Sequence, residues 1–126
     1  MRAVDTNVLV RMIVRDDVKQ ATAADAYVER GGFVSHLALA EATWVLSEVY
    51  GRDASGVALA VEMLLNHTTL AIQDADVVTA ALAHFRKRPS VGFPDCMLVE
   101  IARKAGHVPL GTFDRDLAKL PDVERL

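Results

Sequence analysis

Short apolar runs alternate along the chain with longer segments in which apolar residues recur at helical spacing. The short runs predict β-strands, and they cover residues 2–4, 33–35, 70–72 and 108–113, with an edge strand near Val123. Strands that alternate with helices are typical of an α/β fold with a mainly parallel sheet. The pattern therefore predicts this fold class, with more helices than strands.

The longer segments are bounded by residues that begin or end helices. An aspartate before a helix accepts a hydrogen bond from a free backbone N–H, and a glycine after it tolerates the positive φ found there. With these signals the predicted helices run from about Asn7 to Arg15, from a cap at Asp16 to Gly31, from His36 to Tyr50, from a cap at Asp53 to Asn66, from Asp74 to Arg88, and from Pro94 to Gly106. No repeat or linker interrupts the series, so residues 1–126 are predicted to form a single domain.

Composition and charge narrow the class of protein. With 126 residues, 52% of them hydrophobic, the chain is long enough for one buried core and too apolar for a disordered protein. A net charge of −3 argues against a protein that coats nucleic acid through basic residues, but not against an enzyme that reaches phosphates through metal ions. The single cysteine, Cys96, can form no internal disulfide and no cysteine metal cluster, and its apolar surroundings predict a core position.

The sequence also bears on where the protein acts. No stretch reaches the roughly 20 apolar residues that a membrane span needs. Asp5 and Asn7 interrupt the region in which a signal peptide would have its apolar core. We therefore expect a mature cytoplasmic protein with no membrane partner.

Two aspartates directly follow predicted strands. Asp5 comes after the first strand, and Asp114 comes after the fourth. Ligands of open α/β sheets collect at the carboxyl ends of strands, which makes both aspartates candidate functional residues. The alternative is that each only caps the helix or turn that follows it, and Asp116 offers the same cap two residues later.

Two further acidic residues lie in apolar segments. Glu41 occupies a helix that is apolar almost all round, where a buried charge is costly unless it is paired. The alternative is an exposed position on one narrow polar stripe of that helix. Asp95 follows Pro94 in the first turn of a helix with apolar flanks, and its alternative is a surface aspartate stabilised by the helix dipole.

Convergence of these four acidic residues would require a cation. Two carboxylates about 4 Å apart repel by roughly 4 kcal/mol at an effective dielectric of 20. Mg²⁺ or Mn²⁺ suits hard oxygen ligands, whereas no His or Cys pair stands at zinc-binding spacing. Such a site predicts hydrolysis of a phosphodiester, in which one ion activates a water and a second stabilises the leaving oxygen. The scattered histidines are expected to be satisfied or exposed, which argues against a histidine-based ribonuclease.

Basic residues near these positions are candidates for contacts with phosphates. Arg86, Lys87 and Arg88 precede the Asp95 segment, although positive charge at a helix C-terminus is also ordinary dipole compensation. Arg11 and Arg15 follow Asp5 at a spacing of about one helical turn and are alternative substrate contacts.

Four segments that contain the acidic residues resemble, in their order and spacing, a PIN-domain ribonuclease, and most of all the VapC-type toxins of type II toxin–antitoxin pairs. The segments are Val4–Leu9, Leu39–Leu46, Gly92–Leu98 and Gly111–Asp114. The resemblance covers nearly the whole chain. It implies a three-layer α/β/α sandwich around a mainly parallel sheet and an endoribonuclease that depends on Mg²⁺ or Mn²⁺.

The resemblance also implies roles for individual residues. The metal ligands and catalytic residues would be Asp5, Glu41, Asp95 and Asp114, with Asp116 as the other choice for the fourth position. Thr6, Asn7 and Thr112 would support these ligands. The expected partners are single-stranded or loop RNA as substrate, a second copy of the chain in a homodimer, and a small antitoxin whose tail enters the active-site groove.

Three other functions remain open at this stage. The same site would serve a PIN nuclease of RNA processing. A non-catalytic PIN-like module that binds RNA or protein would have no reason to keep four carboxylates in apolar surroundings. A phosphatase of the haloacid dehalogenase type is matched only in part, because Asn7 stands where a second aspartate is expected.

Overall fold

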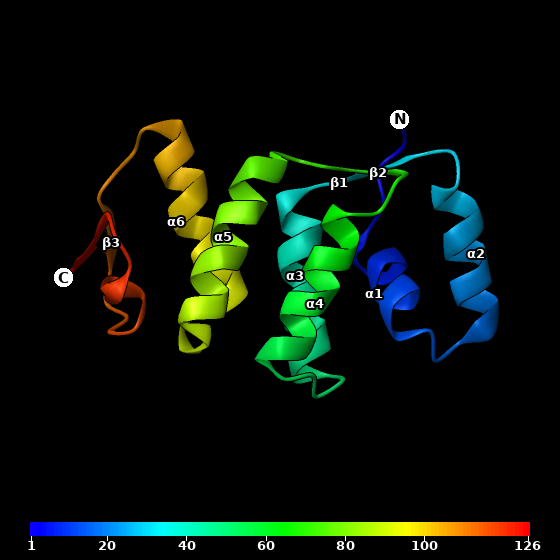
Figure 1. Ribbon diagram of the computed structural model, residues 1–126, viewed down its shortest axis with the longest axis horizontal. Helices are drawn as coiled ribbons and strands as arrows, with labels where there is room; N and C mark the ends of the chain where they lie inside the picture. The colour runs from blue at the N-terminus through cyan, green and yellow to red at the C-terminus, as the bar shows by residue number, and fades with distance from the viewer. The chain divides into compact units, whose positions relative to one another are not determined.

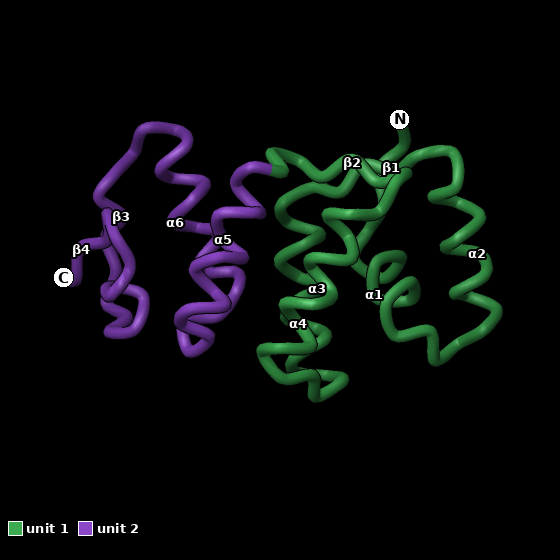
Figure 2. The backbone as a smooth tube through the Cα atoms, in the orientation of Figure 1, with its two compact units in different colours: residues 1–75 green, residues 76–126 purple.

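The computed structural model describes residues 1–126, in six α-helices and four short strands (Figure 1). It divides into two compact units, unit 1 with residues 1–75 and unit 2 with residues 76–126 (Figure 2). The strands pair in parallel within each unit, so the predicted α/β class is confirmed. No helix is both long enough and apolar enough to cross a lipid bilayer.

Unit 1 is built around a parallel strand pair. Strand β1 (Gly32–Val34) pairs with β2 (Leu70–Ile72), and Ala3 forms a parallel bridge to Phe33. The amide of Val4 donates to the carbonyl of Phe33 at 3.0 Å, and the amide of Phe33 donates to the carbonyl of Arg2 at 2.8 Å. The predicted first strand is therefore a short extended segment, and β1 lies between it and β2.

The helices of unit 1 begin where a side chain can cap them. These helices are α1 (Thr6–Val14), α2 (Val18–Val28), α3 (His36–Glu48) and α4 (Ala54–Leu65). Asp53 caps α4, as the sequence predicts, through a bond of 2.9 Å from the amide of Gly56. Two boundaries differ from the prediction. Helix α2 is capped by Asp17, because the predicted cap, Asp16, pairs with Arg11. Ser35, predicted to end the strand, instead caps α3.

The core of unit 1 forms where α1 packs against α2 and α3. Leu9, Leu39 and Leu46 are almost fully buried there. Burying a leucine side chain is favourable by about 1.5–3 kcal/mol relative to leaving it exposed. The helix that Asp5 caps and the helix that carries Glu41 near its middle are thus held together by their apolar faces.

Unit 2 contains α5 (Ala75–Lys87, which begins at the boundary), α6 (Phe93–Ala105), and strands β3 (Leu110–Thr112) and β4 (Val123–Arg125). Short 3₁₀ turns at Pro89–Val91 and Leu117–Lys119 connect these elements. Strands β3 and β4 pair in parallel, which confirms the edge strand predicted near Val123. Gly106 ends α6 with a φ of 81°, a conformation that side chains with a Cβ rarely adopt. Phe93 opens this helix, so Pro94 occupies its second position rather than its first.

Candidate active site

Asp5 lies at the junction between the first extended segment and α1. Its Oδ1 accepts a hydrogen bond of 3.1 Å from the amide of Val8, so Asp5 is the N-cap of the helix. The helix-capping role, which the sequence offered as the alternative for Asp5, is therefore confirmed. It engages one carboxylate oxygen, and the side chain remains exposed.

Glu41 is exposed on α3, so of the two positions that the sequence left open it is the exposed one that holds. The helix buries its other face, through Leu39 and Leu46, and leaves Leu37 69% and Trp44 58% exposed beside Glu41. An apolar helix can present such a stripe outward, so its composition alone does not locate its buried face.

Thr6 joins the two acidic residues of unit 1. It follows Asp5 in the chain, and its hydroxyl donates a hydrogen bond of 3.1 Å to Oε2 of Glu41. The bond connects the first residue of α1 to the middle of α3. It fixes one carboxylate oxygen of Glu41 on the side of α3 that faces the start of α1.

Asp95 is half-buried in the first turn of α6. Burial raises the pKa of its carboxyl, and the negative charge of Asp114 raises it further. The two carboxylates of unit 2 therefore share one electrostatic environment. Repulsion of this kind is relieved by a proton or by a cation.

Asp114 follows β3 and is exposed. Its Oδ1 accepts hydrogen bonds from the amides of Asp116 at 2.8 Å and Leu117 at 2.9 Å, so it caps the turn that the sequence predicts around Leu117. The hydroxyl of Thr112 accepts a bond of 3.0 Å from the amide of Asp114 and steadies this loop. Asp116 differs in that its carboxylate pairs with Lys119 at 3.4 Å.

The four carboxylates thus form two groups, Asp5 with Glu41 in unit 1 and Asp95 with Asp114 in unit 2. Within its own unit, none of them forms an ion pair with a basic side chain. Carboxylate oxygens are the donors that Mg²⁺ and Mn²⁺ prefer. Each unit contributes such oxygens, although neither holds a group of three or more potential metal ligands.

A match to the PIN domain family extends over residues 2–123 and so spans both acidic groups. The chain belongs to the PIN domain family. PIN domains are in general metal-dependent nucleases, and they bind RNA. No curated protein and no solved structure matches the chain.

The arginines of α1 in this PIN domain are engaged within the protein. Arg11 binds the carboxylate of Asp16 at 2.9 Å and the hydroxyl of Tyr50 at 3.0 Å. Arg15 ends the helix and forms a two-bond contact with Asp25, at 2.7 and 3.0 Å. Only Arg11 lines the pocket next to Asp5.

The other predicted phosphate contacts lie in unit 2 of the PIN domain. Arg86, Lys87 and Arg88 are exposed at the C-terminal end of α5. This placement is the one expected for dipole compensation, and it also leaves the side chains accessible to solvent.

One buried acidic residue of the PIN domain is not among the candidates that the sequence indicates. Glu100 on α6 is only 7% exposed, and its Oε1 lies 2.7 Å from Nε2 of His84 and 3.3 Å from Nε of Arg103. A signal was present, because Glu100 continues the apolar series of Phe93, Cys96 and Met97 at helical spacing. His84 is a satisfied histidine, as expected.

Cys96 is fully buried beside these acidic residues. Burial raises the pKa of its thiol to about 12, with smaller contributions from the charges of Asp95 and Glu100. A thiol with this pKa carries almost no thiolate at neutral pH, so Cys96 is an inert core residue, as predicted.

Proposed function

We propose that this PIN domain is an endoribonuclease that cleaves single-stranded or loop RNA by attack of water on a phosphodiester, with Mg²⁺ or Mn²⁺ as cofactor. The observation that carries the proposal is the hydrogen bond of 3.1 Å by which Thr6, next to Asp5, holds a Glu41 carboxylate that has no basic partner in its unit, in a chain whose PIN domain match spans residues 2–123. Carboxylates kept without counter-ions suit a site that cations occupy.

The residues present fit such a cofactor. Asp5, Glu41, Asp95 and Asp114 would supply its oxygen ligands. Burial raises the pKa of Asp95 and the charge of Asp114 raises it further, and a cation would offset both effects. A bound divalent ion lowers the pKa of water and stabilises the leaving oxygen of the phosphodiester.

The residues of the chain itself contribute orientation. The cap bond from Val8 fixes one oxygen of Asp5, and the Thr6 hydroxyl fixes one oxygen of Glu41. The amides of Asp116 and Leu117 fix Oδ1 of Asp114, while the Thr112 hydroxyl accepts from the backbone amide of Asp114 and holds the loop. Ligands held in advance lose little freedom when a cation or substrate binds, and this favours both affinity and rate.

The decisive experiment incubates the purified full chain with single-stranded RNA and Mn²⁺, with and without EDTA. Cleavage that EDTA abolishes, and that Asp5→Asn and Asp95→Asn each reduce at least about 100-fold, is the expected result. Asp17→Asn is the matched control, because it alters another exposed N-cap outside the motifs. Undiminished cleavage by the two site variants would contradict the proposed site, and products with 5′-phosphate ends are expected from water attack.

We further propose that the nuclease is the toxin of a toxin–antitoxin pair, that it acts as a homodimer and that a small antitoxin inhibits it. The support is the resemblance of its four motifs to VapC-type toxins. Expression of the wild-type chain should arrest bacterial growth, and Asp95→Asn should not. Growth without arrest, by a chain that cleaves RNA in vitro, would instead favour a role in RNA processing.

A further inference from the structure

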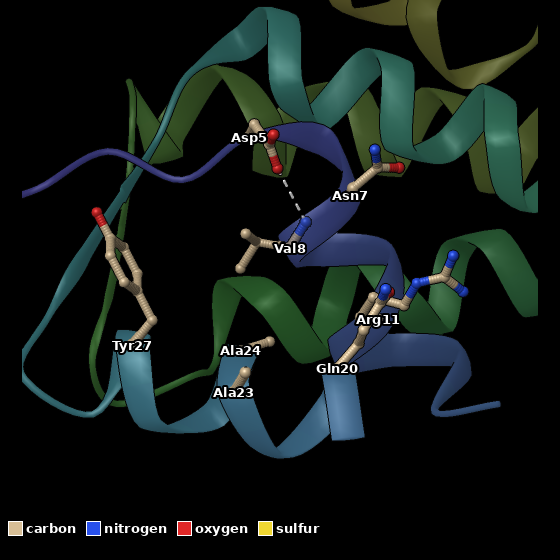
Figure 3. Close-up of a pocket in the computed structure, with 8 residues that line it drawn as sticks. All are labelled: Asp5, Asn7, Val8, Arg11, Gln20, Ala23, Ala24 and Tyr27. Carbon is tan, nitrogen blue, oxygen red and sulfur yellow. Dashed lines mark hydrogen bonds between the residues drawn. The ribbon is translucent and has the colours of Figure 1, made fainter. Parts of the chain in front are cut away.

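A pocket of about 280 Å³ opens between α1 and α2 of unit 1 (Figure 3). Val8 from α1 and Ala23 and Ala24 from α2 provide apolar walls. Ligand pockets in proteins combine such walls with a few polar groups, and this one lies near their lower size limit of roughly 300 Å³. Its size suits one small planar group rather than an extended ligand.

The polar side chains that line the pocket differ in how far their hydrogen-bonding groups are used within the protein. The amide side chain of Gln20 forms no hydrogen bond within the protein, whereas the guanidinium of Arg11 is bound to Asp16 and Tyr50. Tyr27 brings an aromatic ring, with Arg2 over it at 3.9 Å. Unused donors and acceptors beside apolar walls are what a heteroaromatic ring with polar edges requires.

Asp5 belongs both to this pocket and to the proposed active site. We propose that the pocket binds a nucleobase of the RNA substrate, from a nucleotide next to the phosphodiester that is cleaved. The inference rests on the proposed nuclease function and adds to it a determinant of sequence preference. A base whose phosphate is held by a cation at the Asp5 carboxylate is within reach of the pocket, because a nucleotide places its base and its phosphate side by side.

Gln20 is the residue that would distinguish one base from another. Its amide offers both donors and an acceptor, which suits the edges of unstacked bases in single-stranded RNA. The apolar walls contribute binding that any base can use, because stacking and burial require only a flat ring.

The test fills the pocket by Ala23→Leu, an exposed position of α2 where leucine is nearly as good a helix former as alanine. The matched control is Ala26→Leu, the same change at an exposed position of the same helix outside this pocket. Circular dichroism and thermal melting check that both variants fold. Gln20→Ala is a second, conservative variant that removes the proposed reading group without filling space.

Binding is measured first without catalysis, by NMR of alanine methyl groups in EDTA with each of the four nucleosides as probe, because they carry no phosphate for the Asp5 carboxylate to repel. The methyl signal of Ala24 should shift in the wild type and in Ala26→Leu, and not in Ala23→Leu. An Ala24 signal that no nucleoside moves would overturn the pocket assignment, whatever the RNA assay shows. Shifts without any RNA cleavage would support the base site and contradict the nuclease.

Cleavage then tests the role of the site in the reaction. Ala23→Leu should raise KM for RNA about tenfold with little change in kcat, since a stacked base contributes roughly 1–3 kcal/mol to binding. Gln20→Ala should change the preferred base at the cleaved position. The Ala23→Leu variant could instead keep the wild-type KM and base preference and lose only the binding of a partner protein. That result would assign the pocket to a peptide and overturn the proposal.

Discussion

Helices α3 and α6 each carry a glutamate among apolar residues, and the two glutamates have opposite environments. Glu41 is exposed and has no basic partner in its unit, whereas Glu100 is buried between His84 and Arg103. The sequence around the two residues looks alike, but the partners differ. A buried and neutralised carboxylate is part of the scaffold, while an exposed and unneutralised one, oriented by a single threonine, is free to bind something else.

The largest effect that tests this contrast is expected at Glu41. Glu41→Gln keeps the size of the side chain and removes its charge, so cleavage of RNA should fall at least about 100-fold. The free energy of unfolding should change by less than about 0.5 kcal/mol, because the residue is exposed. Initial rates and urea denaturation measure the two quantities. A variant with normal activity would remove Glu41 from the site.

Glu100 should give the reverse result. Glu100→Ala leaves His84 and Arg103 without their shared partner and should lower the free energy of unfolding by about 2 kcal/mol. Cleavage under conditions where the variant stays folded should remain within about twofold of the wild type. Glu124→Ala, at an exposed position of β4, is the control and should leave the unfolding transition where it is. An unchanged transition in Glu100→Ala would deny that the cluster stabilises unit 2.

Thr6 should show an intermediate effect. Thr6→Val removes the donor to Glu41 at nearly constant shape, so the apparent affinity for Mn²⁺ should fall about tenfold. Metal titrations of the cleavage rate measure this change. Thr22→Val, at an exposed position of α2, is the matched control and should leave the titration curve in place. Identical Mn²⁺ titration curves for the wild type, Thr6→Val and Thr22→Val would show that the hydrogen bond from Thr6 does not position Glu41 for metal binding.

The smallest effect concerns Asp25, an exposed carboxylate with a basic partner. Its hydrogen bonds from Arg15 hold the pKa of Asp25 below the ordinary value of 3.8, so the pair stabilises the folded state above that pH and loses this contribution as the pH falls below it. Asp25→Asn should cost less than about 0.5 kcal/mol at pH 7 because both side chains are exposed. Thermal melting from pH 7 to pH 3 should show the gap to the wild type closing. A gap that widens in acid would reverse this assignment.

Local signals predicted much of the fold. The cap at Asp53, the glycine that ends α6, the strand at 70–72 and the turn around Leu117 each depend on residues a few positions apart. The missed boundaries are local competitions as well. Asp16 and Asp17 could both cap α2. Asp16 pairs instead with Arg11, five positions earlier, and Asp17 forms the cap.

The sequence predicted which residues belong to the candidate site better than it predicted the burial and contacts of their side chains. Asp5 and Asp114 follow extended segments, as the pattern indicates. Burial depends on what packs against a helix, and the spacing of apolar residues does not show this. The sequence therefore leaves Glu41 open between a buried and an exposed position and does not mark Glu100 as buried. The hydrogen bond between Thr6 and Glu41 spans 35 positions and has no local signal, although the family resemblance had already placed Thr6 beside the ligands.

The cap formed by Asp5 has a consequence for how the protein can be observed. The amide that Asp5 accepts from belongs to Val8, in the first turn of α1, so the protection of this one proton from exchange with solvent depends on the carboxylate keeping its place. Anything that draws Asp5 outward, a metal ion or a phosphate among them, would loosen that turn and speed the exchange. Hydrogen exchange at the Val8 amide thus reports whether the site is occupied, without any catalytic turnover.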